Sequence, residues 1–271
     1  MKLKLIYINL IFIAILLSCE KDKKLITGNP DIPMLRKVII ADQPYYEYLY
    51  NDANLLSEEK SKLDLTMHYY NYKNQLDITD YYWDTAILSS SLQVLGTALN
   101  RKEWFNPDNA VKGGSVKYEY NNNEQLIKTT FYRPSVIYSE YSEFIYDNND
   151  RISRQTLFWE NKLLGYIDYL YDVKGNLIKE TLYNIPSTGI AELSNTTEYE
   201  FDNNQNPYKS FNRLMTPGIC TNQNNIIKET YTIHYRVDHG AEKVMITETS
   251  YEYNAMGYPV RKNGNIEYEY K

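Results

Sequence analysis

Hydrophobic and polar residues alternate along much of the chain, in short runs that end at turn-forming residues. In the run from 169 to 181, one residue separates Tyr169 from Tyr171, and Leu177 follows a polar stretch rich in Asp, Gly and Asn. Alternation with a period of two is typical of half-buried strands. The last aromatic residue of each run, or its equivalent, is called the anchor here. The anchors are Tyr50, Tyr70, Tyr120, Tyr146, Tyr171, Phe201, Cys220 and Tyr253.

The residues after each anchor favour a tight turn. Asn or Asp follows the anchor directly in seven of the eight copies, and such side chains bond to nearby backbone and start turns. Four residues after the anchor stands Gly, Asn or Asp in six of the eight copies. These residue types tolerate positive φ, which a type I turn with a G1 bulge requires. Each copy is therefore predicted to be a β-hairpin.

The spacing also predicts which side chains of a hairpin share one face of the sheet. Tyr171 should lie opposite Leu177 and Tyr169 opposite Lys179, so that these four residues and Thr181 share one face. Repeat units bury a face only by stacking on their neighbours. The predicted fold class is all-β: repeated antiparallel β-hairpins that form a curved meander or a closed barrel.

Residues 84–105 break this pattern. After Asp84, a candidate N-cap, leucines recur at helical spacing. They are Leu88, Leu92, Leu95 and Leu99. We predict one short helix here, in the N-terminal half, that caps or plugs the sheet. Packing against the core is favoured over a partner-binding role.

The N-terminus has the order of an export signal. Lys2 and Lys4 precede the apolar run Leu5–Leu17, and Ser18 and Cys19 follow it. The run has 13 residues, whereas a membrane-spanning helix needs about 20 apolar residues. An ordinary transmembrane anchor is therefore disfavoured, as is a cysteine placed by chance after a plain signal peptide.

The sequence Leu16-Leu17-Ser18-Cys19 resembles the lipobox of bacterial lipoproteins. The resemblance implies cleavage before Cys19 and lipidation, including palmitate, on this residue. Several acyl chains would hold the protein permanently at a membrane. The charged segment Glu20–Lys24 resembles signals that send lipoproteins to the outer-membrane surface. We expect an outer-membrane lipoprotein on the periplasmic or surface side of the cell envelope.

Three regions follow from these patterns. Residues 1–18 are the predicted lipoprotein signal peptide. Residues 19–44 are the predicted lipidated cysteine and tether, because Gly28, Pro30 and Pro33 interrupt regular structure. Residues 45–271 are the predicted repeat β domain.

The stretch Tyr171–Leu177, with the order Tyr-Asp-x-x-Gly-Asn-Leu, resembles the YD repeat of Rhs-type proteins. Roughly residues 45–271 resemble a family of lipoproteins of unknown function with YD-like repeats and a porin-like, meandering β fold. Glu124 and Gln205 replace the turn glycine in two copies. The resemblance implies a curved antiparallel sheet and no known catalytic residues.

Composition and charge exclude some classes of function. The chain has 29 tyrosines among 271 residues, and tyrosine combines a strand preference with an apolar ring and a polar tip. The net charge is −6, and loss of Lys2 and Lys4 lowers it to −8. A negative surface argues against nucleic acid. With Cys19 lipidated, Cys220 stands alone and no internal disulfide forms.

Candidate catalytic or metal sites are few. His234, Arg236 and Asp238 would share a strand face as half of a metal or acid–base site, but a surface pairing is favoured. His68 and Cys220 occupy repeat positions and are interpreted as structural.

Two carboxylate pairs match the requirement for glycoside cleavage: Glu140 with Glu143, and Asp77 with Asp80. In a chain with 35 acidic residues such pairs arise by chance. We expect no enzyme activity, no cofactor and no metal, with a hydrolase as a remote alternative.

The remaining candidate is a binding platform of tyrosines beside basic side chains. It comprises Tyr118, Tyr120, Lys128, Tyr146, Arg154, Tyr169, Tyr171 and Lys179. These rings would either be exposed for stacking on sugar or peptide, or form the core, and the core is favoured for any given pair. We expect a non-catalytic envelope lipoprotein that binds a glycan, a peptide or an envelope partner. The alternative is a purely structural subunit of an envelope assembly.

Overall fold

The computed structural model describes residues 32–85, 105–137, 139–211, 216–234 and 240–271. This part of the chain forms one antiparallel sheet of 17 strands. The strands are β1 (Leu35–Ile40), β2 (Gln43–Tyr50), β3 (Leu56–Ser61), β4 (Asp64–Tyr70), β5 (Leu76–Asp84), β6 (Ala110–Tyr120), β7 (Leu126–Tyr132), β8 (Glu140–Tyr146), β9 (Ile152–Trp159), β10 (Lys162–Tyr171), β11 (Leu177–Asn184), β12 (Glu192–Phe201), β13 (Ile226–Ile233), β14 (Lys243–Glu248), β15 (Tyr251–Tyr253), β16 (Pro259–Lys262) and β17 (Ile266–Tyr270).

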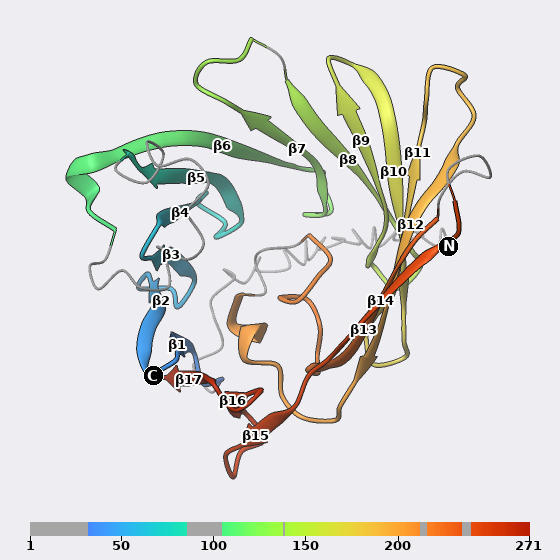
Figure 1. Ribbon diagram of the computed structural model, residues 1–271. Coiled ribbons are helices and arrows are strands. Elements are labelled where there is room, and N and C mark those ends of the chain that lie inside the picture. Colours follow the sequence, from blue (N-terminus) through green and yellow to red (C-terminus); the bar gives the residue numbers. More distant parts are fainter. Residues whose placement is uncertain (1–31, 86–104, 138, 212–215, 235–239) are drawn as a thin grey trace, which may run out of the picture.

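The strands pair in chain order, as a meander. Each strand from β1 to β13 pairs with the next, and β15, β16 and β17 pair in turn and join β1. No register pairing between β14 and β15 is present among the described residues, so the sheet is not closed into a barrel. It is a strongly curved meander, and the segment that carries the 3-10 helix η2 (Pro207–Phe211) lies inside the curve (Figure 1).

The helix predicted over 84–105 is not confirmed. At the two ends of this segment, Asp84 is the last residue of β5 and Phe105 is buried. Residues 86–104 lie outside the described residues. Elsewhere in the described part, the helical elements are two short 3-10 helices, η1 (Pro107–Asn109) and η2.

The predicted hairpin turn is confirmed in six of the eight copies. In the copy at Tyr171, the Asp172 carboxylate accepts from the backbone N–H groups of Lys174 and Asn176. The register shifts by one residue next to the anchor, as a bulge requires. Position four after the anchor has positive φ in six copies, including Glu124 at 67°, where the sequence lacks Gly, Asn or Asp.

The prediction of a separate hairpin at Cys220 is wrong. Phe201 pairs with Ile226, and the backbone N–H of Asp202 donates to the carbonyl of Asn225 at 3.0 Å. The same bond closes the turn at Asn51, where Leu55 is the acceptor. The copies at Phe201 and Cys220 are therefore two halves of one hairpin, separated by an insertion within its turn.

The two ends of the chain build a further unit. Tyr270 on β17 pairs with Leu35 on β1, and the register shifts beside Leu35. This is the anchor-to-hydrophobic pairing of the hairpins, without a connecting turn. The sheet thus begins at Leu35, before the boundary expected at 45, because residues 35–40 complete the unit that the C-terminal strand starts.

In six units, the hydroxyl of the last aromatic residue links the unit to the one before it. The hydroxyl of Tyr171 donates to the carbonyl of Ile152, the first residue of the preceding unit's return strand, at 2.8 Å. The same link recurs for Tyr50 to Leu35, Tyr70 to Leu56, Tyr120 to Leu76, Tyr146 to Leu126 and Tyr270 to Pro259. Such a bond contributes about 1 kcal/mol, so the series holds neighbouring hairpins in one register.

The apolar core lies on the face that carries the anchors. One cluster contains Leu126, Phe144, Ile152, Tyr169 and Leu177. A second packs Leu35, Val38, Tyr48, Leu56 and Tyr268 against Phe211 of η2. Because η2 lies inside the curve, we call this the inner face and the opposite side the outer face (Figure 1).

Candidate binding surfaces

The hairpin bulge separates the predicted platform into two faces. Tyr171 pairs with Leu177 as predicted, but Leu170, and not Tyr169, pairs with Lys179. The bulge adds one residue to the return strand. Every later side chain on that strand therefore points to the face opposite to the one that simple alternation predicts. Lys179 and Thr181 therefore lie on the outer face, away from Tyr169 and Tyr171. The expectation that these residues share one face is wrong.

The tyrosines of the predicted platform belong to the inner face, where their hydroxyls are used within the fold. Tyr120, Tyr146 and Tyr171 make the carbonyl links described above. Tyr169 donates to Gln155 at 2.8 Å, and Tyr118 bonds Thr79 at 3.2 Å. Burial raises the pKa of Tyr146 to about 12. These rings build the scaffold and are not an open platform.

The basic residues of the predicted platform have other partners on the outer face. Lys179 pairs with Glu198 at 2.7 Å. Arg154 pairs with Asp168 through two bonds, at 2.5 and 2.8 Å. The ammonium of Lys128 lies 4.1 Å from the centroid of the Tyr141 ring. The cation–tyrosine pairing predicted by the sequence therefore exists, but with different tyrosines.

Two stacked aromatic pairs lie on the outer face beside these cations. Tyr141 stacks on Phe158 with centroids 4.6 Å apart and planes 11° apart. Tyr166 stacks on Tyr183 at 4.8 Å, and the guanidinium of Arg154 lies 4.0 Å from the Tyr166 ring. All four rings are half-buried. A cation over a ring face is attracted by the quadrupole of the ring and holds it in place.

The strand register places these residues in cross-strand rows. One row runs from Tyr69 on β4 through Ile78, Lys117 and Thr130 to Tyr141 and then Phe158 on β9. A neighbouring row runs from Lys128 through Glu143 and Thr156 to Tyr166 and Tyr183. At about 4.8 Å per strand, the first row extends over about 24 Å. The outer face of β4–β11 therefore offers side chains suited to an extended ligand.

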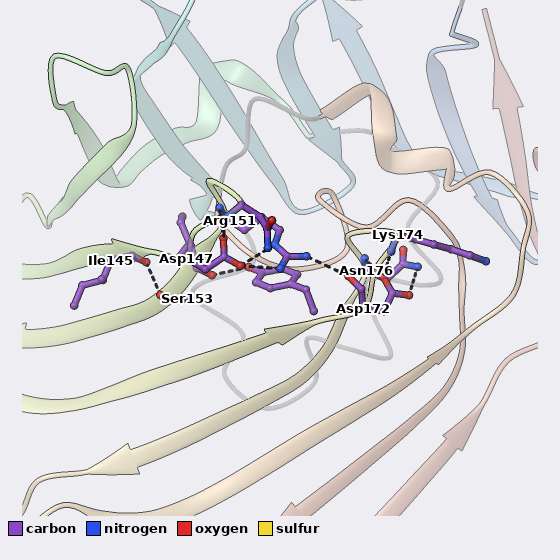
Figure 2. Close-up of polar contacts among 10 residues, drawn as sticks. Ile145, Asp147, Arg151, Ser153, Asp172, Lys174 and Asn176 are labelled. Atoms are coloured by element: carbon purple, nitrogen blue, oxygen red, sulfur yellow. Dashed lines mark hydrogen bonds and ion pairs between the residues drawn. The ribbon is translucent and has the colours of Figure 1, made fainter.

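Neighbouring hairpin turns, which lie at the ends of the strands, are joined by a side chain that bonds both. Arg151 binds the carboxylate of Asp147 in its own turn and donates to the carbonyl of Asp172 in the next turn at 3.1 Å (Figure 2). Its guanidinium also lies 4.7 Å from the Tyr171 ring. Burial opposes ionisation of Asp147, but the bonds from Arg151 outweigh it and hold the pKa of Asp147 below its usual range. These contacts rigidify the two turns.

A hydroxyl, an imidazole and a carboxylate meet on the inner face. Nδ1 of His68 lies 3.0 Å from Oγ1 of Thr79, and Nε2 lies 2.8 Å from a carboxylate oxygen of Glu59. This is the order of a nucleophile, a base and an orienting acid. Thr79 is only 1% exposed, so no substrate reaches its hydroxyl. The group is a buried polar link, and His68 has the structural role that the sequence indicated.

Among the described residues, the other candidates do not assemble into a reactive site. His234 pairs with Glu242 and bonds Thr196, while Arg236 and Asp238 lie outside the described residues. Burial raises the pKa of the Cys220 thiol to about 12.

One member of each predicted carboxylate pair forms an ion pair with a basic side chain. Glu140 binds Arg133, and Asp80 binds Lys112. The described residues hold no group of three metal-ligating side chains.

Comparison with known proteins finds only distant structural likenesses. No protein-family model and no curated protein matches the sequence. A porin-like protein from Bacteroides uniformis aligns with 88% of this chain and 98% of its own, at 11% identity and a TM-score of 0.39. One from Bacteroides vulgatus aligns with 89% and 99%, at 11% identity and a TM-score of 0.38.

The TcdB2–TccC3 complex is also similar over 78% of this chain and 10% of its own, at 14% identity and a TM-score of 0.29. With TM-scores below 0.5, these likenesses carry no argument about function. Within the described residues, no helix is both long and apolar enough to cross a membrane.

Several residues that hold the fold together were not identified from the sequence. Buried asparagines dock the insertion: Asn222 accepts from the N–H of Leu177 at 2.8 Å, and Asn176 accepts from the N–H groups of Gln223 and Asn224. Asn206 donates to the carbonyl of Asn222. Asparagine-rich stretches carry no signal that separates these residues from turn asparagines. Tyr141 and Tyr166 each stand five residues before an anchor, an odd number, so strand alternation alone places them on the face opposite the anchors.

Proposed function

We propose that this protein is a non-catalytic lipoprotein of the cell envelope, anchored by lipid on Cys19, whose β scaffold binds a glycan on its outer face. The observation that carries the proposal is the difference between the two sets of tyrosines. Inner-face rings pack in the core, whereas the outer face presents the half-buried pairs Tyr141–Phe158 and Tyr166–Tyr183 beside Lys128 and Arg154. The Tyr141 hydroxyl donates to Asn161 at 3.3 Å, so the stacked rings, and not free hydroxyls, are what this face offers.

A glycan suits this surface better than an extended peptide. Strands β4–β11 pair with neighbours on both edges, so their backbone offers no free edge for strand addition. Recognition must come from side chains that stand on the face of the sheet. Aromatic rings pack against the C–H faces of sugar rings, while the polar tips, cations and threonines supply hydrogen bonds.

The absence of catalysis is part of the proposal. The hydroxyl–imidazole–carboxylate group at Thr79, His68 and Glu59 is enclosed, and Cys220 has a raised pKa that disfavours a thiolate. Both observations argue against catalysis by these residues.

Glycan-array binding of the full lipidated chain in liposomes tests the proposal. We expect the wild type to bind a glycan and Tyr141→Ala to lower the affinity at least tenfold. The variant removes one ring of the stacked pair and the ring over which the Lys128 ammonium lies. Leu170→Ala, an exposed outer-face change, is the matched control and should leave binding unchanged. No glycan bound by the wild type, or equal loss in the control, would reject the binding role.

The anchor is tested separately. Cells fed an alkyne fatty acid should label the wild-type protein and not Cys19→Ala. Labelling of the variant would contradict lipidation at Cys19.

A role as an assembly subunit has one observation in its favour. β14 pairs with β13 along one edge, no pairing of its other edge is present among the described residues, and Val244 and Ile246 are exposed. An unpaired edge is a template for another chain. A photo-crosslinker at Ile246 that captures one defined envelope protein in cells, with no glycan bound by the array, would favour this second role.

A further inference from the structure

A groove opens on the outer face across four strands, β4 to β7. It has a volume of about 460 Å³, within the range of small-ligand pockets. Tyr69 on β4 and Tyr132 on β7 form its two sides, and Ile78, Asp80 and Ser115 form its floor. The sides are separated by three strand spacings, or about 14 Å.

The register shows why these side chains meet. Tyr69 pairs with Ile78, which pairs with Lys117, so these three form one row. Asp80 pairs with Ser115, which pairs with Tyr132, in the next row on the same face. Large side chains at the ends of the rows and smaller ones between them leave the hollow.

The floor of the groove is an ordered polar network. Asp80 is 7% exposed, and its carboxylate accepts from Ser115 at 2.7 Å and from Tyr82 at 3.3 Å. Lys112 pairs with the same carboxylate at 2.8 Å. The negative charge of Asp80 is thus matched by Lys112. The ammonium of Lys112 has three donors, and its side chain is 42% exposed, so donors remain for a ligand.

Lys117 gives the groove an excess positive charge. Its side chain is exposed, lines the groove and makes no ion pair within the described part of the chain. Two lysines therefore face one carboxylate. This local excess lies on a protein whose net charge is −6. A densely anionic polymer would be repelled by the whole molecule, whereas a single carboxylate on a mostly neutral ligand would be attracted.

The walls favour a ring-shaped ligand. The exposed fractions of the two walls, Tyr69 and Tyr132, are 42% and 51%, and Ile78 on the floor is 36% exposed. The hydroxyl of Tyr132 has no hydrogen-bond partner among the described residues, so both its ring and its polar tip are available. Two amphipathic rings on either side of a polar floor suit a ligand with apolar faces and hydroxyl edges, which is the character of a sugar.

We propose that this groove binds a carboxylate-bearing sugar ring of a glycan. The carboxylate lies against Lys117 and Lys112, and the apolar sugar faces pack on Tyr69 and Tyr132. Ser115, whose proton is donated to Asp80, accepts from a sugar hydroxyl. The inference rests on the proposed function and adds the chemical class of one bound residue. The row from Tyr69 to Phe158 leads from the groove to the first stacked pair, so one chain can occupy both.

The experiment compares a xylo-oligosaccharide that carries a single glucuronic acid residue with its methyl ester, by calorimetric titration of the full lipidated chain in detergent. The ester replaces the charged carboxylate by a neutral group with one added methyl and leaves the rest of the ligand unchanged. We expect the acid to bind at least tenfold more tightly than the ester, with a preference that weakens as salt is added.

Lys117→Gln should remove this preference, because it removes the unpaired charge without disturbing Asp80. Lys162→Gln is the matched control, since Lys162 is also exposed and without an ion pair among the described residues, and it should behave as wild type. Tyr132→Ala should weaken both ligands, because it removes a wall.

Equal affinity for acid and ester, or an unchanged preference in Lys117→Gln, would overturn the inference. N-acetylneuraminyl-lactose serves as a second acidic ligand and distinguishes a uronic acid from a sialic acid as the source of the carboxylate. If neither acid binds but the array shows Tyr141-dependent binding, this groove assignment fails and the proposed function stands. If neither experiment shows binding, both fail.

Discussion

The inner and outer faces of this sheet use tyrosine in two different ways. On the inner face, Tyr171 donates to the Ile152 carbonyl and packs in the core with Leu177. On the outer face, Tyr132 is 51% exposed, and its hydroxyl has no partner among the described residues. A phenol that satisfies its hydroxyl within the fold is part of the scaffold. One that leaves ring and hydroxyl open is available to a ligand.

The largest expected difference between the faces is in apolar packing. Leu177 is fully buried on the inner face, and Leu170 is 56% exposed on the outer face of the neighbouring strand. Leu177→Ala should lower the free energy of unfolding by about 2–5 kcal/mol, because it leaves a cavity. Leu170→Ala should change it by less than about 0.5 kcal/mol. Urea denaturation measures both, and similar losses would contradict the assignment of the faces.

The hydroxyl links should show the next largest effect. Tyr171→Phe removes only the oxygen that donates to Ile152 and leaves a buried carbonyl with one bond fewer. We expect a loss of about 1 kcal/mol in the free energy of unfolding. Tyr132→Phe is the outer-face control and should be nearly neutral. If thermal unfolding shows equal shifts for the two variants, the links do not hold the repeats together.

Substitutions at equivalent turn positions should change the free energy of unfolding in opposite directions. Glu124 has φ of 67° and Gly175 has φ of 91°, each four residues after its anchor. Left-handed backbone costs a non-glycine residue about 1–2 kcal/mol.

Glu124→Gly should therefore raise the free energy of unfolding by up to about 1 kcal/mol, and Gly175→Ala should lower it by a similar amount. The ion pair that Glu124 makes with Lys73, at 3.7 Å, is half-exposed and offsets only a few tenths of this. Shifts of the same sign in urea denaturation would show that the two turns differ.

The smallest expected effect concerns pH. Burial opposes ionisation of Asp172, but bonds from Asn176 and from backbone N–H groups outweigh it and hold its pKa below the usual range. The unfolded value is about 3.9, so the stabilisation is present above it and is lost as the pH falls through the folded pKa.

Asp172→Asn keeps an acceptor that Asn121 uses in an equivalent turn. The difference in stability between wild type and this variant should shrink as the pH falls below about 4. A constant difference across an acid titration would assign no role to the charge.

Local features were predictable because they depend on a few consecutive residues. An Asx side chain, a residue with positive φ and an aromatic anchor lie within one turn, and the copy at Tyr171 folds as its sequence predicts. The bulge was also predicted, but its consequence for Lys179 was missed, because one added residue reverses the facing of the return strand. The outer-face position of Lys128, Arg154 and Lys179 follows from that single step.

The sequence by itself determined the hairpin units, their turns and the all-β class, since each unit closes through bonds between neighbours in the chain. Only the tertiary structure decided which units adjoin and which carbonyl each tyrosine reaches. It also showed that Leu35 completes the unit begun by Tyr270 and that the halves at Phe201 and Ile226 form one hairpin. The reason is physical. Similar local patterns can pair with one another in many ways, and the burial and long-range hydrogen bonds that select one arrangement join residues far apart in the chain.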